Sequence, residues 1–214
     1  MDAKLLAWGR AVASRGASRA RRRSGYPSQD LIPMPPKAAR IPPLWLFTDS
    51  KRLADPRAAV ARLPRGLAGV VFRHDDHPQR ARMGHDLARI CRARRLVLVV
   101  AGDVRLAAAL RAGVHLRGGN WPGRLRVKGF VTSSAHCFTD LRRAARAGAG
   151  LAFLAPVFAT ASHPGAASLG PGRWSGLARK APIEVAALGG IDGSSIRRLP
   201  RDLCHAVGAI GALA

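Results

Sequence analysis

The sequence is poor in acidic residues, aromatic residues and cysteine, and it has no long apolar run. Its 214 residues include 12 aspartates and glutamates against 36 lysines and arginines, and 5% are aromatic. No apolar stretch approaches the roughly 18 residues that a membrane-spanning helix requires, so we expect no membrane association. The three cysteines (Cys91, Cys137 and Cys204) lack metal-ligand spacing. They predict free thiols in a reducing compartment, and therefore a cytoplasmic protein.

The shortage of acidic residues leaves a formal net charge of +24, which raises the question of nucleic-acid binding. Basic side chains attract phosphate backbones when they gather on one element. Here the arginines are spread along the chain among alanines, and no alternation of aromatic and basic residues suggests a stacking surface for bases. We therefore expect no specific nucleic-acid partner, and we interpret the charge as a field that attracts small phosphorylated ligands.

The first 40 residues differ in composition from the rest. Arginine, serine, glycine and alanine dominate up to residue 23, and a proline-rich stretch follows at residues 32–36. Because this composition buries little apolar surface, we predict a flexible basic extension (residues 1–40) with at most a weak helix near residues 4–14. It is also typical of an organellar transit peptide, and a start codon placed upstream of the true one would produce a similar segment.

From residue 41 onward, short apolar runs alternate with amphipathic segments. Runs typical of buried parallel strands lie at residues 44–48, 69–73, 96–100, 114–116, 127–132, 151–155, 185–188 and 206–210. Helical spacing occurs at residues 55–63, 79–94, 104–111, 140–147 and 173–179. This rhythm predicts an α/β fold, a (β/α)8 TIM barrel over residues 41–214, with an open flavodoxin-like sheet as the alternative.

The sequence reaches Ala214 where an eighth helix is expected to begin. We therefore expect a truncated last helix. The gap would be covered by the N-terminal extension or by a partner subunit, or the strands near both termini would be exposed. A homodimer would provide the second kind of cover.

Chemistry in such barrels is located in the loops that follow the strands. Gly189 and Gly190 follow the seventh run, where glycine lets the backbone turn sharply and present N–H groups to a phosphate. Gly211, after the eighth run, is similarly open. The loop after the sixth run contributes three polar side chains: Thr160, Ser162 and His163. These loops predict a phosphate-binding site.

Six short motifs, in order along the chain, resemble the thiamine phosphate synthase family, which includes the thiazole tautomerase-like (TenI-like) proteins. They lie at residues 46–49, 70–73, 113–116, 134–136, 156–160 and 187–191. The resemblance implies a (β/α)8 barrel with a role in thiamine biosynthesis. The synthases of this family join hydroxymethylpyrimidine diphosphate to thiazole phosphate and release pyrophosphate with the help of Mg²⁺.

The resemblance also implies roles for individual residues. Arg73 would hold the diphosphate through its forked guanidinium, and Ser134 would lie near the reacting pyrimidine. The other substrate- or phosphate-binding candidates come from the loops after strands six, seven and eight: Thr160, Ser162, His163, Gly189, Gly190 and Gly211. Homodimers are common in the family, so we expect self-association.

The sequence departs from the family pattern at the metal and diphosphate end. The Asn-Asp pair expected after the third strand reads Ala101-Gly102, and Asp103 follows one position late. A second carboxylate position holds Asn120, and a phosphate-binding lysine position holds Asp75. Mg²⁺ prefers carboxylate oxygens, so Asp103 is the remaining metal-ligand candidate and Mg²⁺ dependence is expected only of a synthase.

His136 leads to a second hypothesis. The resemblance implies that a histidine after the fifth strand acts as the acid and base of a metal-free thiazole tautomerase, a role that suits imidazole because its pKa is near neutrality. A third hypothesis is a non-catalytic barrel that binds a phosphorylated ligand. Of the other histidines, we interpret His115 as structural, and we expect three to be solvated at the surface: His74, His77 and His85.

Overall fold

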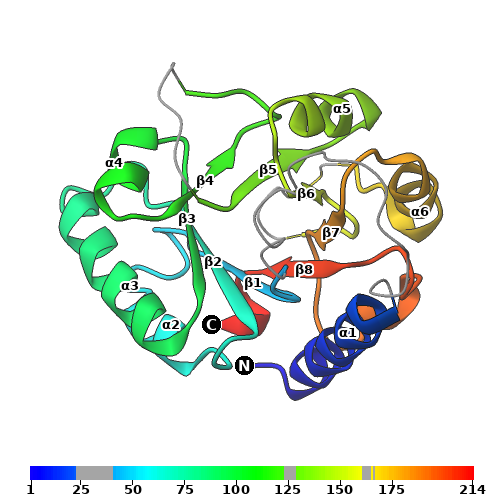
Figure 1. Ribbon diagram of the computed structural model, residues 1–214, viewed down its shortest axis with the longest axis horizontal. Helices are drawn as coiled ribbons and strands as arrows, with labels where there is room; N and C mark the ends of the chain where they lie inside the picture. Colours follow the sequence, from blue (N-terminus) through cyan, green and yellow to red (C-terminus); the bar gives the residue numbers. More distant parts are fainter. Residues whose placement is uncertain (23–40, 123–128, 161–164, 166) are drawn as a thin grey trace.

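The computed structural model describes residues 1–22, 41–122, 129–160, 165 and 167–214. Eight parallel strands form a closed barrel in sequence order (Figure 1). The strands are β1 (Leu44–Phe47), β2 (Ala68–Phe72), β3 (Val97–Ala101), β4 (Gly113–Leu116), β5 (Val131–Ala135), β6 (Leu151–Leu154), β7 (Val185–Leu188) and β8 (Ala206–Ala209). Pairing of Leu44 with Val207 closes the ring between β1 and β8. This confirms the predicted TIM barrel and excludes the open sheet.

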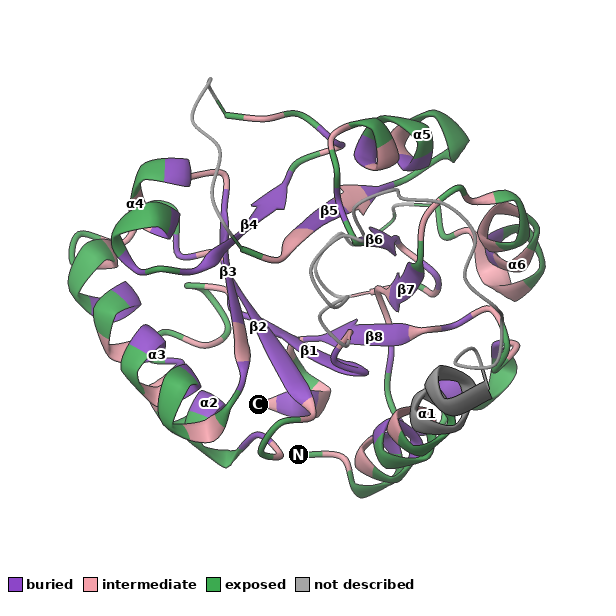
Figure 2. Ribbon diagram, in the orientation of Figure 1, coloured by how far each residue is buried: buried purple, intermediate pink, exposed green. Residues whose placement is uncertain are grey.

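Helices surround the barrel in the described part of the chain. They are α1 (Ala3–Arg22), α2 (Arg57–Arg62), α3 (Arg80–Arg94), α4 (Val104–Ala109), α5 (Phe138–Arg146), α6 (Gly170–Lys180) and the 3-10 helices η2 (Ser195–Arg198) and η3 (Gly211–Leu213). The strands are buried on both sides, and the helices expose their outer faces (Figure 2). The predicted strand and helix positions agree closely with these bounds, except at β5.

Two residues explain the difference at β5. The predicted strand covers residues 127–132, whereas β5 begins at Val131 and its first buried residue is Thr132. Thr132 and Ser133 are fully buried although polar, because Thr132 Oγ1 bonds His115 Nδ1 at 2.8 Å and Ser133 Oγ accepts from the Gly119 N–H at 2.9 Å. Burying a hydroxyl that has a hydrogen-bond partner costs the protein little stability. A search for apolar residues alone misses such polar strand positions, so it places β5 too early in the sequence.

Aromatic side chains fill the interior of the barrel. Trp45 and Phe47 of β1 both pack against Phe153 of β6 in edge-to-face contacts, with ring centroids 5.6 and 4.8 Å apart. Trp45 also donates from Nε1 to the Pro42 carbonyl at 2.7 Å, so its buried N–H has a partner. This aromatic packing fills the part of the barrel interior between β1 and β6.

The flexibility predicted for the start of the chain is wrong at the first part of α1, which packs on the barrel. Leu5 is fully buried and Trp8 is 8% exposed. Gly9 follows on the same face, where a Cβ atom would lie 2.7 Å from the Leu44 side chain. A helix needs only such a narrow apolar stripe to dock, which an average over an arginine-rich segment does not show. Residues 23–40 lie outside the described residues.

Helix α1 occupies the position of an eighth barrel helix. The Asp2 N–H donates to the Ala212 carbonyl at 2.8 Å, beyond the carboxyl end of β8, whereas Gly9 contacts Leu44 at the amino end of β1. The helix therefore runs antiparallel to the strands, and in Figure 1 it closes the helical ring beside β8. After β8 the chain continues in η3. Of the two expected forms of cover, the N-terminal segment is the one observed.

Candidate functional site

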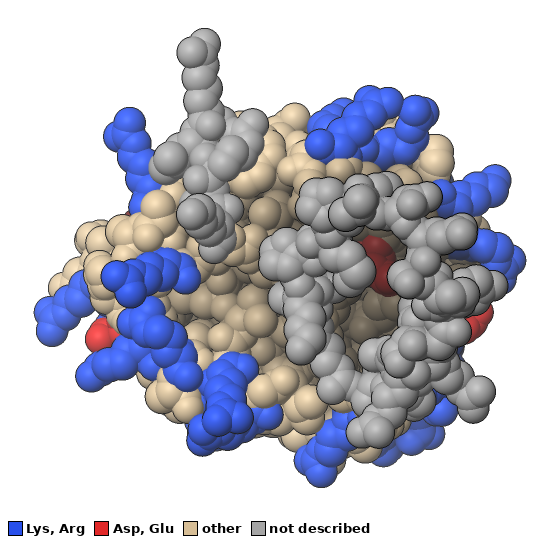
Figure 3. All heavy atoms as spheres, in the orientation of Figure 1, with Lys and Arg blue, Asp and Glu red and all other residues tan. Residues whose placement is uncertain are grey.

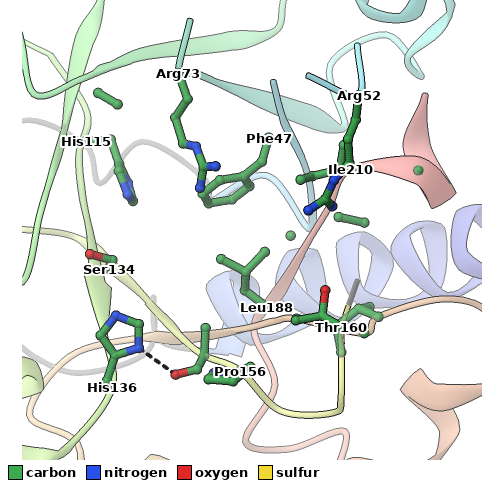
Figure 4. A pocket seen from close by; sticks show the side chains of 18 of the residues that line it. Phe47, Arg52, Arg73, His115, Ser134, His136, Pro156, Thr160, Leu188 and Ile210 are labelled. Atoms are coloured by element: carbon green, nitrogen blue, oxygen red, sulfur yellow. Dashed lines mark hydrogen bonds between the residues drawn. The ribbon is translucent and has the colours of Figure 1, made fainter. Parts of the chain in front are cut away.

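A cavity of about 730 Å³ opens at the carboxyl ends of the strands (Figure 4). Seven predicted site residues line it: Arg73, Ser134, His136, Thr160, Gly189, Gly190 and Gly211. Two others, Ser162 and His163, lie outside the described residues. The barrel therefore brings residues from the ends of β2, β5, β6, β7 and β8 to one place, as expected for loops that follow parallel strands.

The floor of the cavity is apolar. Phe47, Leu188 and Ile210 lie between the polar side chains, and Phe47 is 1% exposed. A flat apolar floor surrounded by polar groups suits a small heteroaromatic ring, which stacks on carbon and hydrogen-bonds at its edge.

The Gly189-Gly190 loop packs tightly against the loop after β6. Both residues have positive φ, 91° and 64°. A Cβ atom at Gly189 would lie 2.8 Å from the Pro156 Cα, and one at Gly190 would lie 2.6 Å from the Ala159 carbonyl oxygen. Glycine is therefore required twice, for the backbone angle and for the approach of the two loops. This packing presents bare backbone to the cavity beside Thr160, as a phosphate site requires.

The His136 ring is oriented by one hydrogen bond. Its Nδ1 lies 2.8 Å from the Ala155 carbonyl oxygen, and Figure 4 shows this contact as a dashed line. Because a carbonyl only accepts, Nδ1 carries the proton, and the neutral ring has its lone pair on Nε2. The His136 N–H donates to Asp140 Oδ2 at 2.9 Å, which ties the residue to α5. The bond to Ala155 thus selects the tautomer in which Nε2 accepts a proton.

His115 also lines the cavity, but its surroundings keep it neutral. The ring is 3% exposed and bonds Thr132 through Nδ1. Burial lowers the pKa of His115 to about 3, and the positive charges of Arg73 and Arg117 act in the same direction. The structural role predicted for this residue agrees with its burial, and its position adds a neutral imidazole to the wall.

The prediction that His74 is solvated is wrong, because this residue is fully buried. Its Nδ1 bonds Thr48 Oγ1 at 2.9 Å and its Nε2 bonds the Leu53 carbonyl at 3.0 Å. Desolvation by burial lowers the pKa of His74. The Arg73 N–H donates to the same Thr48 hydroxyl, so this network holds the backbone that carries Arg73. His85 is exposed as predicted, and His77 is partly buried.

Two cavity arginines were not predicted. Arg52 and Arg117 line the same space as Arg73, whose Nη2 lies 3.4 Å from Asp49 Oδ2. Arg117 directly follows the end of the predicted fourth strand, so its place in the cavity could have been predicted from the sequence. Arg52 lies in a loop without a recognisable motif. Figure 3 shows further lysines and arginines spread around the edge of this face rather than gathered in one patch.

The acidic residues near the cavity are engaged by arginine and by backbone. Asp103 caps α4 by accepting from the Leu106 N–H at 2.9 Å, and it pairs with Arg80 at 3.1 Å. Asp75 pairs with both Arg80 and Arg117. Over the described residues, no group of three histidine, cysteine, aspartate or glutamate side chains is placed to hold a metal ion. Among the described residues, the carboxylates of Asp75 and Asp103 are thus already engaged by arginine.

The fold and the cavity define a (β/α)8 barrel protein with a site at the carboxyl ends of its strands. Comparison with known families gives the assignment: residues 44–213 match the model described as thiamine monophosphate synthase, and the chain belongs to this family. Over the described residues, no helix is both long and apolar enough to cross a membrane.

Individual relatives agree with the family assignment. A putative thiamine-phosphate synthase 2 of Aquifex aeolicus (strain VF5) is 28% identical over 180 residues, which cover 80% of this chain and 94% of the relative. A thiamine-phosphate synthase of Thermosynechococcus vestitus is 32% identical over 151 residues, 65% of this chain but 42% of that protein. The solved thiamine phosphate pyrophosphorylase of Pyrococcus furiosus superposes with a TM-score of 0.64 at 20% identity, covering 80% and 86% of the two chains. That likeness supports the fold.

Proposed function

We propose that the cavity binds a thiazole phosphate and that His136 shifts a proton on the thiazole ring, a metal-free isomerisation within thiamine biosynthesis. The observation that carries the proposal is the bond between His136 and Ala155, which leaves the Nε2 lone pair for the ligand. An imidazole with one free lone pair can accept a proton there and return it.

The proposed reaction is balanced without a co-reactant. Nε2 of His136 accepts a proton from one ring position of the thiazole and becomes an imidazolium. The same proton then returns to another ring position, so product and substrate have the same composition and the histidine is regenerated. The Ala155 carbonyl stabilises the imidazolium because Nδ1–H still donates to it.

The phosphate of this ligand is assigned to the opposite side of the cavity. Gly189, Gly190 and Gly211 line the cavity there, and Thr160 lies beside them. The apolar floor at Phe47 would carry the ring between this end and His136 (Figure 4). The proposed ligand therefore spans the cavity from the glycine loops to the end of β5.

A second candidate function is the condensation expected of a synthase, and the guanidinium groups favour it. Arg52, Arg73 and Arg117 all line the cavity, and guanidinium binds phosphate oxygens in pairs. They would stabilise the pyrophosphate that leaves hydroxymethylpyrimidine diphosphate. The engaged carboxylates Asp75 and Asp103 count against a version of this reaction that uses Mg²⁺.

One set of assays separates the candidates. Purified protein is incubated with the thiazole phosphate in a chelating buffer, and isomerisation of its ring is followed by proton NMR. The parallel reaction contains thiazole phosphate and hydroxymethylpyrimidine diphosphate, with and without Mg²⁺, and is assayed for thiamine phosphate and pyrophosphate. The variants His136→Gln and His85→Gln serve as test and control, because His85 is exposed on α3 away from the cavity.

We expect isomerisation in the chelator that His136→Gln abolishes and His85→Gln preserves. Thiamine phosphate formation without isomerisation would instead establish the synthase candidate. Binding of thiazole phosphate in calorimetry with neither reaction would leave the non-catalytic barrel.

A further inference from the structure

Asp2 joins the start of α1 to two loops of the barrel. Its Oδ1 accepts from the N–H groups of Lys4 and Leu5 at 2.9 and 3.1 Å, which caps the helix. Its Oδ2 accepts from the Gly193 N–H at 2.6 Å, and its own N–H donates to the Ala212 carbonyl at 2.8 Å. One carboxylate therefore caps α1 with one oxygen and holds a distant loop with the other.

The contact with Gly193 depends on the absence of a side chain. A Cβ atom at this position would lie 2.5 Å from both Asp2 Oδ1 and Lys4 Cβ. The Gly193 N–H is also the main reason that the pKa of Asp2 is lowered. Two independent features, a short hydrogen bond and a missing side chain, thus bring the helix against this loop.

Both loops held by Asp2 lead directly into the phosphate end of the cavity. Gly193 comes three residues after Gly190, and Ala212 comes next to Gly211. Gly190 and Gly211 line the cavity, whereas Asp2 is not among its lining residues. Asp2 thus lies behind the cavity wall, at the point where the loops after β7 and β8 meet α1.

We propose that Asp2 is a positioning residue, which holds the loops after β7 and β8 at the spacing that receives a phosphate group. This inference rests on the proposed function only in placing the ligand phosphate at these loops. Each loop is short and rich in glycine, so its backbone has many alternative conformations. A fixed charged acceptor behind them restricts these conformations and lowers the cost of ordering the loops on binding.

The variant Asp2→Asn separates the two roles of this carboxylate. Asparagine is as good an N-cap as aspartate, so its oxygen still caps α1. Its amide NH₂ would then face the Gly193 N–H, and two donors cannot bond each other. The matched control is Asp55→Asn, because Asp55 Oδ1 also accepts from a backbone N–H, that of Arg57, on the exposed surface before α2.

Binding is measured by calorimetry with three probes: inorganic phosphate, thiazole phosphate and the unphosphorylated thiazole alcohol. We expect Asp2→Asn to weaken both phosphate-bearing probes about threefold to tenfold, in proportion to one lost charged hydrogen bond. The Kd for the thiazole alcohol should stay the same, and Asp55→Asn should change none of the three. A purely structural role for Asp2 would weaken all three probes equally or none of them, and either result would overturn the proposal.

A second variant covers the case in which Asp2→Asn unfolds. Gly193→Ala places a methyl group against Asp2 and Lys4 and should separate the loop from α1. The same selective loss of phosphate affinity is expected, together with faster hydrogen exchange at residues 193–195. Unchanged exchange and unchanged affinity would contradict the proposal. Because no turnover is measured, a failure of the proposed isomerisation leaves this result unaffected.

Discussion

Arg80 Nη1 lies 3.1 Å from Asp103 Oδ2, and this ion pair links α3 to the start of α4 at the edge of the cavity. The other terminal nitrogen, Nη2, donates to Asp75 Oδ1 at 3.1 Å and to the Ala101 carbonyl at 2.9 Å. Arg80 thereby connects the ends of β2 and β3. Arg117 extends the group by pairing with Asp75 from the end of β4. Guanidinium groups tie these three strand ends together.

Replacing Arg80 by Met should destabilise the protein. The Arg80 side chain is 17% exposed, so its loss leaves two carboxylates and a carbonyl without this partner, at a cost of about 1–3 kcal/mol. Urea unfolding of Arg80→Met, Asp103→Asn and the double variant measures the coupling between the two residues. Additive effects in this double-mutant cycle would show that the pair contributes nothing to stability.

Gly9→Ala and Gly176→Ala should change stability in opposite directions. The new methyl group at Gly9 would meet Leu44 at 2.7 Å, whereas at Gly176, on the exposed face of α6, nothing lies within 4 Å. Alanine favours a helix by up to about 1 kcal/mol at both positions, but overpacking at position 9 should exceed this by about 1–2 kcal/mol. Denaturation midpoints give the comparison. Equal stabilisation of both variants would mean that α1 is not packed as described.

Stability should fall between pH 7 and pH 5 because of buried histidine. His115 has a pKa of about 3 in the folded protein, against about 6.5 in an unfolded chain. Between these values only the unfolded chain binds the proton, so the free energy of unfolding decreases as the pH falls, by about 2 kcal/mol from pH 7 to pH 5 for one such residue. The lowered pKa of His74 acts in the same direction. Asp192, with a pKa of about 2, loses its contribution only at lower pH.

The variant His115→Asn tests this assignment. Urea unfolding at pH 5 and pH 7 should show a smaller difference for this variant than for the natural sequence. His85→Asn, at an exposed position, should retain the full difference. A pH dependence that is identical in all three proteins would show that His115 does not titrate on unfolding.

Only one of the three thiols should react in the folded protein. Cys137 is exposed at the start of α5, whereas burial raises the pKa of both Cys91 and Cys204 to about 12 and denies access to reagents. Titration with Ellman's reagent should release one equivalent rapidly, and three in denaturant. Cys137→Ser should remove the rapid phase. Rapid reaction of a second thiol would instead indicate local opening near β8 or α3.

Most of the barrel was predictable because its strands are continuous apolar runs. Both faces of the strands are buried, as at Phe47, Val71 and Val207. The strands can therefore be recognised as continuous apolar runs, without an alternation of apolar and polar residues. The loops after the strands then located most of the cavity wall without any knowledge of distances.

Helix α1 and the cavity arginines were less accessible to sequence reasoning, for different reasons. The described docking face of α1 includes Leu5, Trp8 and Gly9, with Leu6 and Val12 partly buried beside them. These few residues do not stand out in an arginine-rich segment. Arg52 and Arg117 are two among many arginines, and composition does not say which of them face a cavity. Likewise, the engagement of Asp75 and Asp103 depends on Arg80, which no motif connects with either residue.

The docking of α1 has a consequence for the order in which the protein folds. The helix is synthesised before the barrel strands, but the partners of Asp2 at its start, Gly193 and Ala212, follow much later in the sequence. During synthesis α1 therefore cannot dock until β7 and β8 have emerged from the ribosome, and Leu5 and Trp8 stay exposed until then. Contacts between such distant parts of a chain form late and slow the folding reaction. The last step of folding should thus bring α1 against the loops after β7 and β8. In a nascent chain that stops before β8, the barrel should remain open.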